Sequence, residues 1–171
     1  MKTILSDKLP RIIKAKKELE EQLKIKITNR GKEVTISGKP EDEYIAEKVI
    51  DAINFGFLIS TALLIKKEDY LFETLLIKNY TKRHDLKRIK ARIIGTKGGT
   101  LKTLHELTKC FFELKDYEIG IIGDPEYIKN AQDATISLIK GSKQSNVYNY
   151  LEKHQIKPII DLGLKHQKKK K

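Results

Sequence analysis

The chain has 171 residues, enough for one ordinary domain or two small ones, and 39% of them are hydrophobic. Its 35 Lys and Arg residues outnumber 23 Asp and Glu, and the resulting net charge of +12 favours a polyanionic partner. Without the five lysines at positions 165 and 168–171, the net charge is still +7. The single cysteine, Cys110, excludes an internal disulfide, and no stretch approaches the 18 apolar residues of a membrane span. We therefore expect a cytoplasmic protein with no membrane partner.

The segment 1–57 is predicted to form a short mixed unit. A strand is expected at 2–5 and a helix over 11–23, with almost no room for a separate helix between them. Alternating apolar residues predict a hairpin of strands 24–28 and 33–37, closed by an Asn-Arg-Gly turn. An amphipathic pattern then predicts a helix over about 41–54.

A linker with a short helix is expected over 58–69, followed by a second mixed unit. The β-prone run at 70–77 predicts a strand, and apolar residues spaced by three and four predict a helix over 84–94. A second short helix follows from Leu101 to Thr108, and then strands at 110–114 and 119–122. Asp124 is a plausible N-cap and Pro125 a first helical residue, so the last helix of this unit is expected to begin there.

A glycine turn separates the first two helices of this second unit. It reads Gly95-Thr96-Lys97-Gly98, and glycines let a backbone turn approach another polymer closely. A Walker loop would need Gly-Lys followed by Ser or Thr at its end, and a dinucleotide fingerprint would need G-x-G-x-x-G directly after a strand. Neither pattern is present, which leaves a phosphate-gripping turn or a helix-to-helix turn without a ligand.

Positive charge is concentrated around this turn. Between positions 82 and 102 there are eight basic residues and one acidic residue, Asp85. An RNA backbone crossing the turn would need such a surface, although a solvated basic face without a ligand remains an alternative.

The two units are related by a constant offset in the sequence, the one that aligns Gly38 with Gly123. Ten identities fall at this offset, among them a repeated Gly-x-Pro-Glu step before a helix, which indicates duplication of one fold unit. In the first unit the positions of the glycine turn are filled by Pro-Arg-Ile-Ile at 10–13. The first copy therefore lacks the turn, and its expected role is packing or a protein interface, with RNA contact through its lysines as the second choice.

The order strand, helix, glycine turn, helix, strand, strand, helix resembles a type I KH domain, whose turn clamps about four nucleotides of single-stranded RNA. The expected fold class is α+β, with two tandem type I KH (β-α-α-β-β-α) domains, the first degenerate and without its GxxG turn. The expected division is a degenerate KH-like domain over 1–57, the linker over 58–69, a KH domain with the intact GTKG turn and a C-terminal helical extension over 70–152, and a basic tail over 153–171.

Further segments narrow the resemblance. The step Ile-Ile-Gly-Asp-Pro-Glu at 121–126, the continuation Val-Tyr-Asn-Tyr-Leu-Glu at 147–152 and the Gly-Phe junction at 56–57 are similar to the archaeal relatives of Partner of Nob One, a Dim-two-like family of small-subunit assembly factors. This resemblance implies an RNA-binding protein of ribosome biogenesis that binds the 3′ end region of small-subunit rRNA and assists its maturation. The implied protein partners are the endonuclease that matures that end, or an initiation factor.

The expected RNA-binding residues surround the turn and the groove beside it. Arg88 and Arg92 lie one helical turn apart, and both are expected to reach the RNA. One of Phe111 and Phe112 is expected to be buried and the other to offer a stacking surface; for each apolar residue, plain core packing is the alternative. The full set is Arg88, Arg92, Ile93, Ile94, Gly95, Thr96, Lys97, Gly98, Gly99, Leu101, Lys102, Cys110, Phe111 and Phe112.

Catalysis finds no support in the sequence. The four histidines show no metal-ligand spacing, Cys110 has no cysteine partner for zinc, and His105 is expected on a solvated helix face. We expect no enzymatic activity, no cofactor and no metal. Two functions remain: selective binding of single-stranded RNA in small-subunit maturation, and a KH-fold adaptor that docks an assembly or initiation factor with little RNA selectivity.

Overall fold

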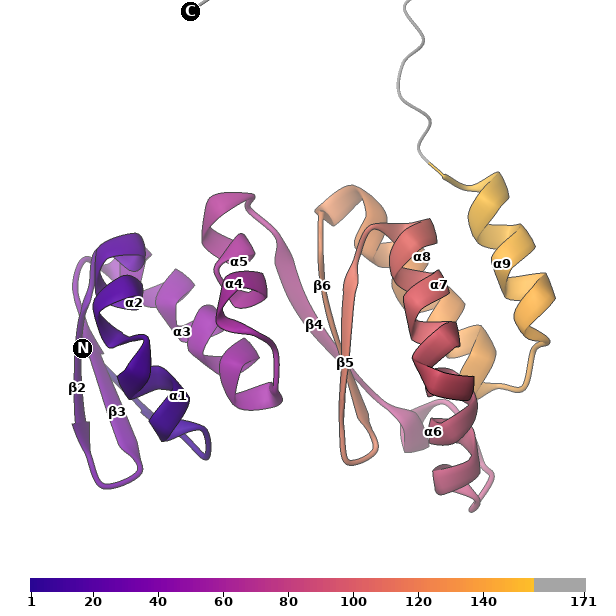
Figure 1. The fold of residues 1–171 in the computed structure, drawn as a ribbon, viewed down its shortest axis with the longest axis horizontal. Helices are drawn as coiled ribbons and strands as arrows, with labels where there is room; N and C mark the ends of the chain where they lie inside the picture. The colour runs from indigo at the N-terminus through magenta and orange to yellow at the C-terminus, as the bar shows by residue number, and fades with distance from the viewer. Residues whose placement is uncertain (156–171) are drawn as a thin grey trace, which may run out of the picture.

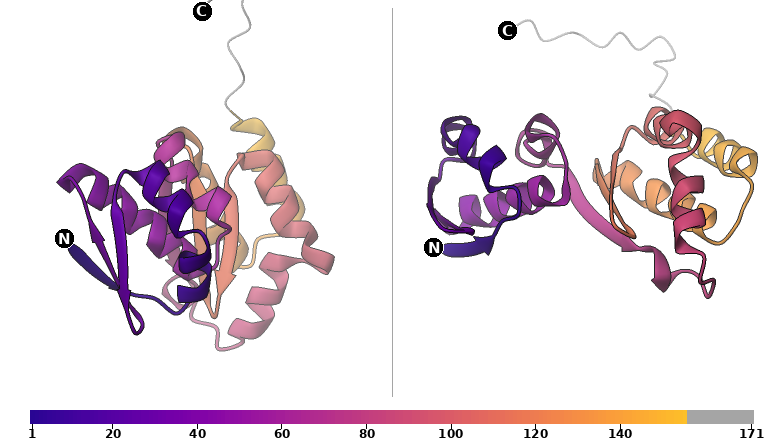
Figure 2. Two further views of the ribbon diagram at one scale, coloured as in Figure 1. Left: turned by 60° about the vertical axis from the view of Figure 1, so that its left-hand side comes forward. Right: turned by 60° about the horizontal axis from the view of Figure 1, so that its bottom comes forward.

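The computed structural model describes residues 1–155, so the predicted basic tail lies outside the described residues from position 156 on. The fold has two three-stranded antiparallel sheets with helices between them, and further helices cover the second sheet on its other face (Figures 1 and 2). The α+β class and the KH-type topology are confirmed. Among the described helices, none combines the length and apolar character that a membrane span requires.

The first unit has the order β-α-α-β-β-α. Its elements are β1 (Lys2–Leu5), α1 (Leu9–Lys14), α2 (Lys16–Leu23), β2 (Lys26–Arg30), β3 (Glu33–Ser37) and α3 (Pro40–Phe55). The sheet order is β1-β3-β2. One prediction was wrong: the single helix expected over 11–23 is two helices that meet at Ala15, where φ is −99° and ψ is 8°. Ala15 is hydrogen-bonded to both helices, because its N–H donates to Arg11 O at 3.2 Å and its carbonyl accepts the Leu19 N–H at 2.9 Å; the bend contains neither proline nor glycine.

The linker forms two single-turn helices, α4 (Ile59–Ala62) and α5 (Leu64–Lys67). It begins after Gly56, whose φ of 131° suits a residue without a Cβ atom. Its apolar side chains pack into the core of the first unit, since Ala62, Leu63 and Ile65 are all buried there.

The second unit repeats the first and adds a helix. Its elements are β4 (Leu71–Leu76), the 3-10 turn η1 (Ile77–Asn79), α6 (Leu86–Ile94), η2 (Thr96–Gly98), α7 (Gly99–Thr108), β5 (Phe111–Lys115), β6 (Glu118–Gly123), α8 (Pro125–Ile139) and α9 (Gln144–Lys153). The sheet order is β4-β6-β5, and α9 packs on α7 and α8. The predicted N-cap is confirmed, because the Asp124 carboxylate accepts the Glu126 N–H at 2.8 Å.

The constant offset between the units also holds for their secondary structure. Strands β2 and β5 align residue for residue, and α3 and α8 both begin on the repeated proline. Lys24 and Lys109, another aligned pair, end the second helix of their units with φ values of 56° and 58°. The duplication inferred from sequence is therefore a duplication of backbone geometry.

Strand β6 joins the two units. Its side chains alternate across the sheet, so Ile119 and Ile121 enter the core under α6, α7 and α8, whereas Ile122 enters the core of the first unit. Gly120 faces the first unit as well, and a Cβ atom there would lie 2.7 Å from the Phe55 ring. The sheet β4-β6-β5 thus stands between α6–α8 on one side and α3–α5 on the other (Figure 1).

Candidate nucleic-acid interface

The glycine turn forms a tight corner between α6 and α7. Gly95 has φ 76° and ψ 174°, Lys97 has φ 53° and Gly98 has φ 73°. The corner is closed by the Gly98 N–H, which donates to Gly95 O at 3.2 Å. Positive φ at three positions of one short turn sets this segment apart from an ordinary helix bend.

The two glycines of the motif serve different purposes. At Gly95 a Cβ atom would lie 2.2 Å from Thr100 Oγ1, so this residue allows the turn to close on α7. At Gly98 a Cβ atom would meet no atom within 4 Å, so this residue leaves the outer surface of the turn clear. Gly99 also faces open space but has ordinary helical geometry, and it begins α7. A polymer backbone can therefore approach the turn over Gly98.

Exposed cations border this open surface. Lys97 lies within the turn and Lys102 follows in the first turn of α7, and both are exposed; Arg88 is exposed too, but it lies in the first turn of α6, at the end away from the glycine turn. Asp85, the one acidic residue among the basic residues of segment 82–102, is paired with an arginine, because Arg83 Nε donates to Asp85 Oδ1 at 2.9 Å. That hydrogen bond holds the pKa of Asp85 below its usual value. The carboxylate is thereby paired with a cation of its own, and the surface beside the turn keeps its positive charge.

Arg92 lies elsewhere. Its guanidinium donates to Leu138 O at 3.1 Å and also to Ser142 O, at the end of α8. The prediction that Arg88 and Arg92 both reach the RNA is therefore wrong for Arg92, which holds the end of α8 against α6. Both residues occupy the same helix, but Arg88 is exposed whereas the Arg92 guanidinium is bound by backbone carbonyls, and spacing alone does not distinguish them.

The inner side of the turn is supported by α9. Thr100 is only 4% exposed, and its hydroxyl accepts a hydrogen bond from Gln144 Nε2 at 3.0 Å. The same amide lies 3.4 Å from Arg92 O, so it connects both helices that flank the turn. Gln144 is the first residue of α9, a helix that lies outside the β-α-α-β-β-α order. Sequence reasoning missed this support, because no local pattern marks an amide side chain so far along the chain from the turn.

An apolar hollow of about 310 Å³ opens beside α7. Its lining comes from α7 (Leu101, Lys102, His105), from β5 (Phe111, Phe112, Glu113) and from the linker (Phe57, Leu58, Thr61). Four predicted site residues, Leu101, Lys102, Phe111 and Phe112, meet here. Phe111 and Phe112 are both half-buried and pack against different cores, so the expectation of one buried and one free ring is wrong.

Two other predicted contacts belong to the core. Ile93 and Cys110 have no exposed surface, and they pack beneath the groove rather than lining it. Burial raises the pKa of the Cys110 thiol to about 11, so the thiol is neutral at physiological pH and unsuited to nucleophilic chemistry. Ile94 and Thr96 stay at the rim of the turn, half-buried and exposed respectively.

His105 and Glu113 also line the hollow beside α7, and the sequence did not predict either of them as a site residue. His105 is half-buried, its Nδ1 donates to Cys110 O at 2.8 Å, and its ring lies 4.8 Å from that of Phe111. His105 follows Leu101 by four residues, so both lie on one face of α7; this spacing is the signal by which the sequence could have indicated His105. Glu113 is partly buried, and burial raises the pKa of its carboxyl.

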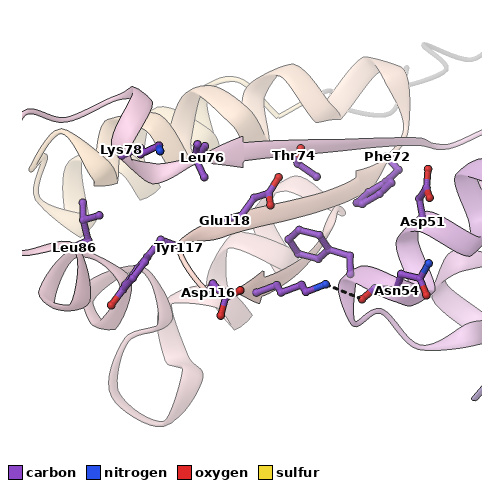
Figure 3. A pocket seen from close by; sticks show the side chains of 12 residues that line it. Asp51, Asn54, Phe72, Thr74, Leu76, Lys78, Leu86, Asp116, Tyr117 and Glu118 are labelled. Atoms are coloured by element: carbon purple, nitrogen blue, oxygen red, sulfur yellow. Dashed lines mark hydrogen bonds between the residues drawn. The ribbon is translucent and has the colours of Figure 1, made fainter. Parts of the chain in front are cut away.

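A second hollow, of about 490 Å³, lies between α3 and the face of the second sheet that is turned toward the first unit (Figure 3). Three carboxylates, Asp51, Asp116 and Glu118, line it together with two lysines, and Lys115 Nζ donates to Asn54 O at 3.4 Å. Burial raises the pKa of Asp51. This mixed charge does not suit an RNA backbone, so the glycine turn and the hollow beside α7 remain the candidate nucleic-acid interface.

A β-α-α-β-β-α unit with a glycine turn between its first two helices defines a KH domain of type I. Residues 71–156 match the family described as the eukaryotic-type KH domain, type I, which is half of the chain. A KH domain-containing protein of Methanocaldococcus jannaschii is 26% identical over 149 residues, which cover 83% of this chain and 66% of the relative. The RNA-binding protein pno1 of Drosophila pseudoobscura is 33% identical over 138 residues, which cover 76% and 58%.

Solved structures have the same fold. Dim2p from Pyrococcus horikoshii superposes with a TM-score of 0.80 at 28% identity, covering 89% of this chain and 98% of that one. A complex of a/eIF2alpha, aDim2p and rRNA from the same organism gives a TM-score of 0.78 at 29% identity, with coverage of 89% and 92%. The chain belongs to the family of tandem KH proteins that includes PNO1 and Dim2p. It spans about half to two thirds of the length of the curated relatives it matches.

Proposed function

We propose that the chain binds single-stranded RNA at the Gly95–Gly98 turn and acts in maturation of small-subunit rRNA near its 3′ end. The observation that carries the proposal is the open backbone at Gly98, bordered by Lys97 and Lys102 and followed by the apolar hollow beside α7. Phosphates would cross the turn while bases lie against Leu101 and Phe112.

Two relatives support the choice of RNA. One is named a pre-rRNA-processing protein, from Eremothecium gossypii, and one similar structure is a complex with rRNA. The 3′ end region and the small subunit come from the family resemblance, and they are the finer part of the proposal.

The test is binding of an RNA from the 3′ end of small-subunit rRNA and of a scrambled control, measured by fluorescence anisotropy. The variant combines Lys97→Asp with Gly98→Asp. The added Cβ atom at position 98 meets no protein atom, and Asp is among the residues that adopt the left-handed geometry of Gly98, where φ is 73° and ψ is 13°; thermal unfolding verifies that the variant is folded. We expect the variant to lose at least tenfold in affinity, whereas Lys129→Asp, an exposed charge reversal on α8, changes it by about twofold or less. Equal affinity for both RNAs, untouched by the double change, would reject the proposal.

A second candidate function is docking of a protein, and the similar complex that contains a/eIF2alpha favours it. In this alternative an initiation factor subunit is the partner, and the first unit, which lacks the turn, supplies the docking surface. The endonuclease stays a prediction. Co-purification that depends on exposed first-unit residues such as Leu5, and not on Lys97, would support docking.

A further inference from the structure

A third hollow lies on the first unit, at the junction of its two short helices. It measures about 510 Å³ and is lined by Arg11, Lys14, Ala15 and Glu18 from α1 and α2, and by 58–60 from the linker. The constant offset between the units aligns Arg11, Lys14 and Ala15 with Thr96, Gly99 and Thr100. This hollow therefore occupies the place in the first unit that the glycine turn occupies in the second.

The chemistry of the two places differs. Ile12, which aligns with Lys97, is completely buried in α1, and the segment is helical, so no open amide turn is presented. Any phosphate held here must be held by side chains. Arg11 and Lys14 supply two cations, and the Arg11 guanidinium is oriented by the Phe57 carbonyl oxygen at 3.3 Å.

The two hollows adjoin at one residue. Leu58 lines both the hollow beside α7 and the hollow on the first unit, and it is 64% exposed. A large exposed apolar side chain between the apolar hollow beside α7 and the cations of the first unit is a suitable surface for an unstacked base. Glu113 and Glu18 also line this path, but the three cations Lys102, Arg11 and Lys14 outnumber these two carboxylates, unlike the lysines of the hollow against α3.

We propose that single-stranded RNA leaving the groove of the second unit crosses Leu58 and places a phosphate beside Arg11 and Lys14. The first unit, although it has no clamp, then extends the RNA site with side-chain cations. This inference rests on the proposed function, since the second unit must hold the RNA first. It differs from that function in predicting that affinity depends on RNA length through residues of the first unit.

The experiment compares an RNA of four nucleotides with one of ten that contains it. The variant is Lys14→Glu; Lys14 is exposed and lines the hollow on the first unit but not the hollow beside α7, so the fold and the site of the second unit are retained. Lys17→Glu is the charge-matched control, because Lys17 is exposed on α2 but does not line the hollow. Thermal unfolding verifies that all three proteins are folded.

We expect the variant to bind the short RNA like the wild type and the long RNA about three- to tenfold more weakly. The dependence of log K on log salt should also become shallower by about 0.7 for each phosphate that the variant no longer neutralises. If the variant gains as much affinity as the wild type from four to ten nucleotides, the proposed RNA contact with the first unit is rejected, whereas the proposed site at the glycine turn is not affected. Failure of the wild type to bind the short RNA overturns the clamp, and with it the extension.

Discussion

At the residue scale, Gly95 is the position where the turn tolerates least change. Its φ of 76° and ψ of 174° fall in a region that is essentially reserved for glycine, and a Cβ atom would overlap Thr100. We expect Gly95→Ala to lower the free energy of unfolding by about 1–3 kcal/mol and to weaken RNA binding more than tenfold. Urea titration and fluorescence anisotropy measure the two effects.

The matched control is Gly99→Ala. Gly99 has ordinary helical geometry and open space around its α-carbon, so alanine should keep stability or raise it by a few tenths of a kcal/mol at the start of α7. A Gly99→Ala protein as damaged as Gly95→Ala would show that the turn is sensitive to any methyl group and contradict the division of roles between the glycines.

The raised pKa of Glu113 predicts a pH dependence of definite sign for RNA binding at the proposed site. Burial raises the pKa of this carboxyl above its unfolded value, so the folded state is favoured by protonation and loses that advantage as pH rises through the raised pKa. The carboxylate that forms repels phosphates, so RNA affinity should fall over the same range. We expect Glu113→Gln to bind RNA about two- to threefold more tightly at pH 7.5.

Anisotropy titrations at pH 5.5 and 7.5 separate Glu113 from its neighbours. His105 and Lys102 line the same hollow, and Arg11 lies near enough to lower the Glu113 pKa, so the wild type alone does not identify the group. The difference between wild type and Glu113→Gln should shrink at the lower pH. A constant difference would mean that the carboxylate does not act on the RNA.

At the scale of elements, helix α9 supports the turn through Gln144. Its side chain is the link between α9 and both Thr100 and the last turn of α6. We expect Gln144→Ala to leave global stability within about 1–2 kcal/mol of the wild type, because one neutral hydrogen-bonding side chain is removed. The amides of residues 95–100 should nonetheless exchange hydrogen faster, while those of α8 do not.

Hydrogen exchange followed by mass spectrometry tests this, with Ser145→Ala as the control, since Ser145 is exposed on the same turn of α9. Unchanged exchange at the turn in Gln144→Ala would show that α9 is only an outer layer. RNA affinity should fall in parallel with any faster exchange, because a less ordered turn must be ordered again on binding.

Sequence patterns predicted the elements of the second unit well because local signals carry them. The Asp124 cap and the apolar spacing of α6 are contacts between near neighbours, and they appear in the structure as expected. The bend at Ala15 was missed because no proline or glycine marks it. The misassigned Arg92 and the support by Gln144 depend on which distant groups meet a side chain, and no local pattern records that.

At the scale of the molecule, the contact between the units depends on the absence of a side chain at Gly120. Phe55 and Phe57 press against this position on β6, and Phe72 packs edge-on against both rings. We expect Gly120→Val to lower the free energy of unfolding by about 1–3 kcal/mol, because the added branched side chain must displace packed rings. Urea denaturation measures the change.

Thr74→Val is the companion variant. Thr74 lies opposite Gly120 on β4 and is exposed, so a nearly isosteric change there should alter stability by about 0.5 kcal/mol or less. If Gly120→Val proved equally mild, the rings would not be packed against the strand as described.

Strand β6 contributes side chains to both cores, Ile121 to one and Ile122 to the other. The separation between the glycine turn and Lys14 is therefore fixed by packed side chains rather than by a slack linker. With a fixed separation, the affinity of the protein should depend on RNA length in two steps. An RNA too short to span the two sites should gain no affinity from the first unit, and an RNA longer than the span should bind no more tightly than one that just spans it. The shared strand would in this way set the length of single-stranded RNA that the protein selects.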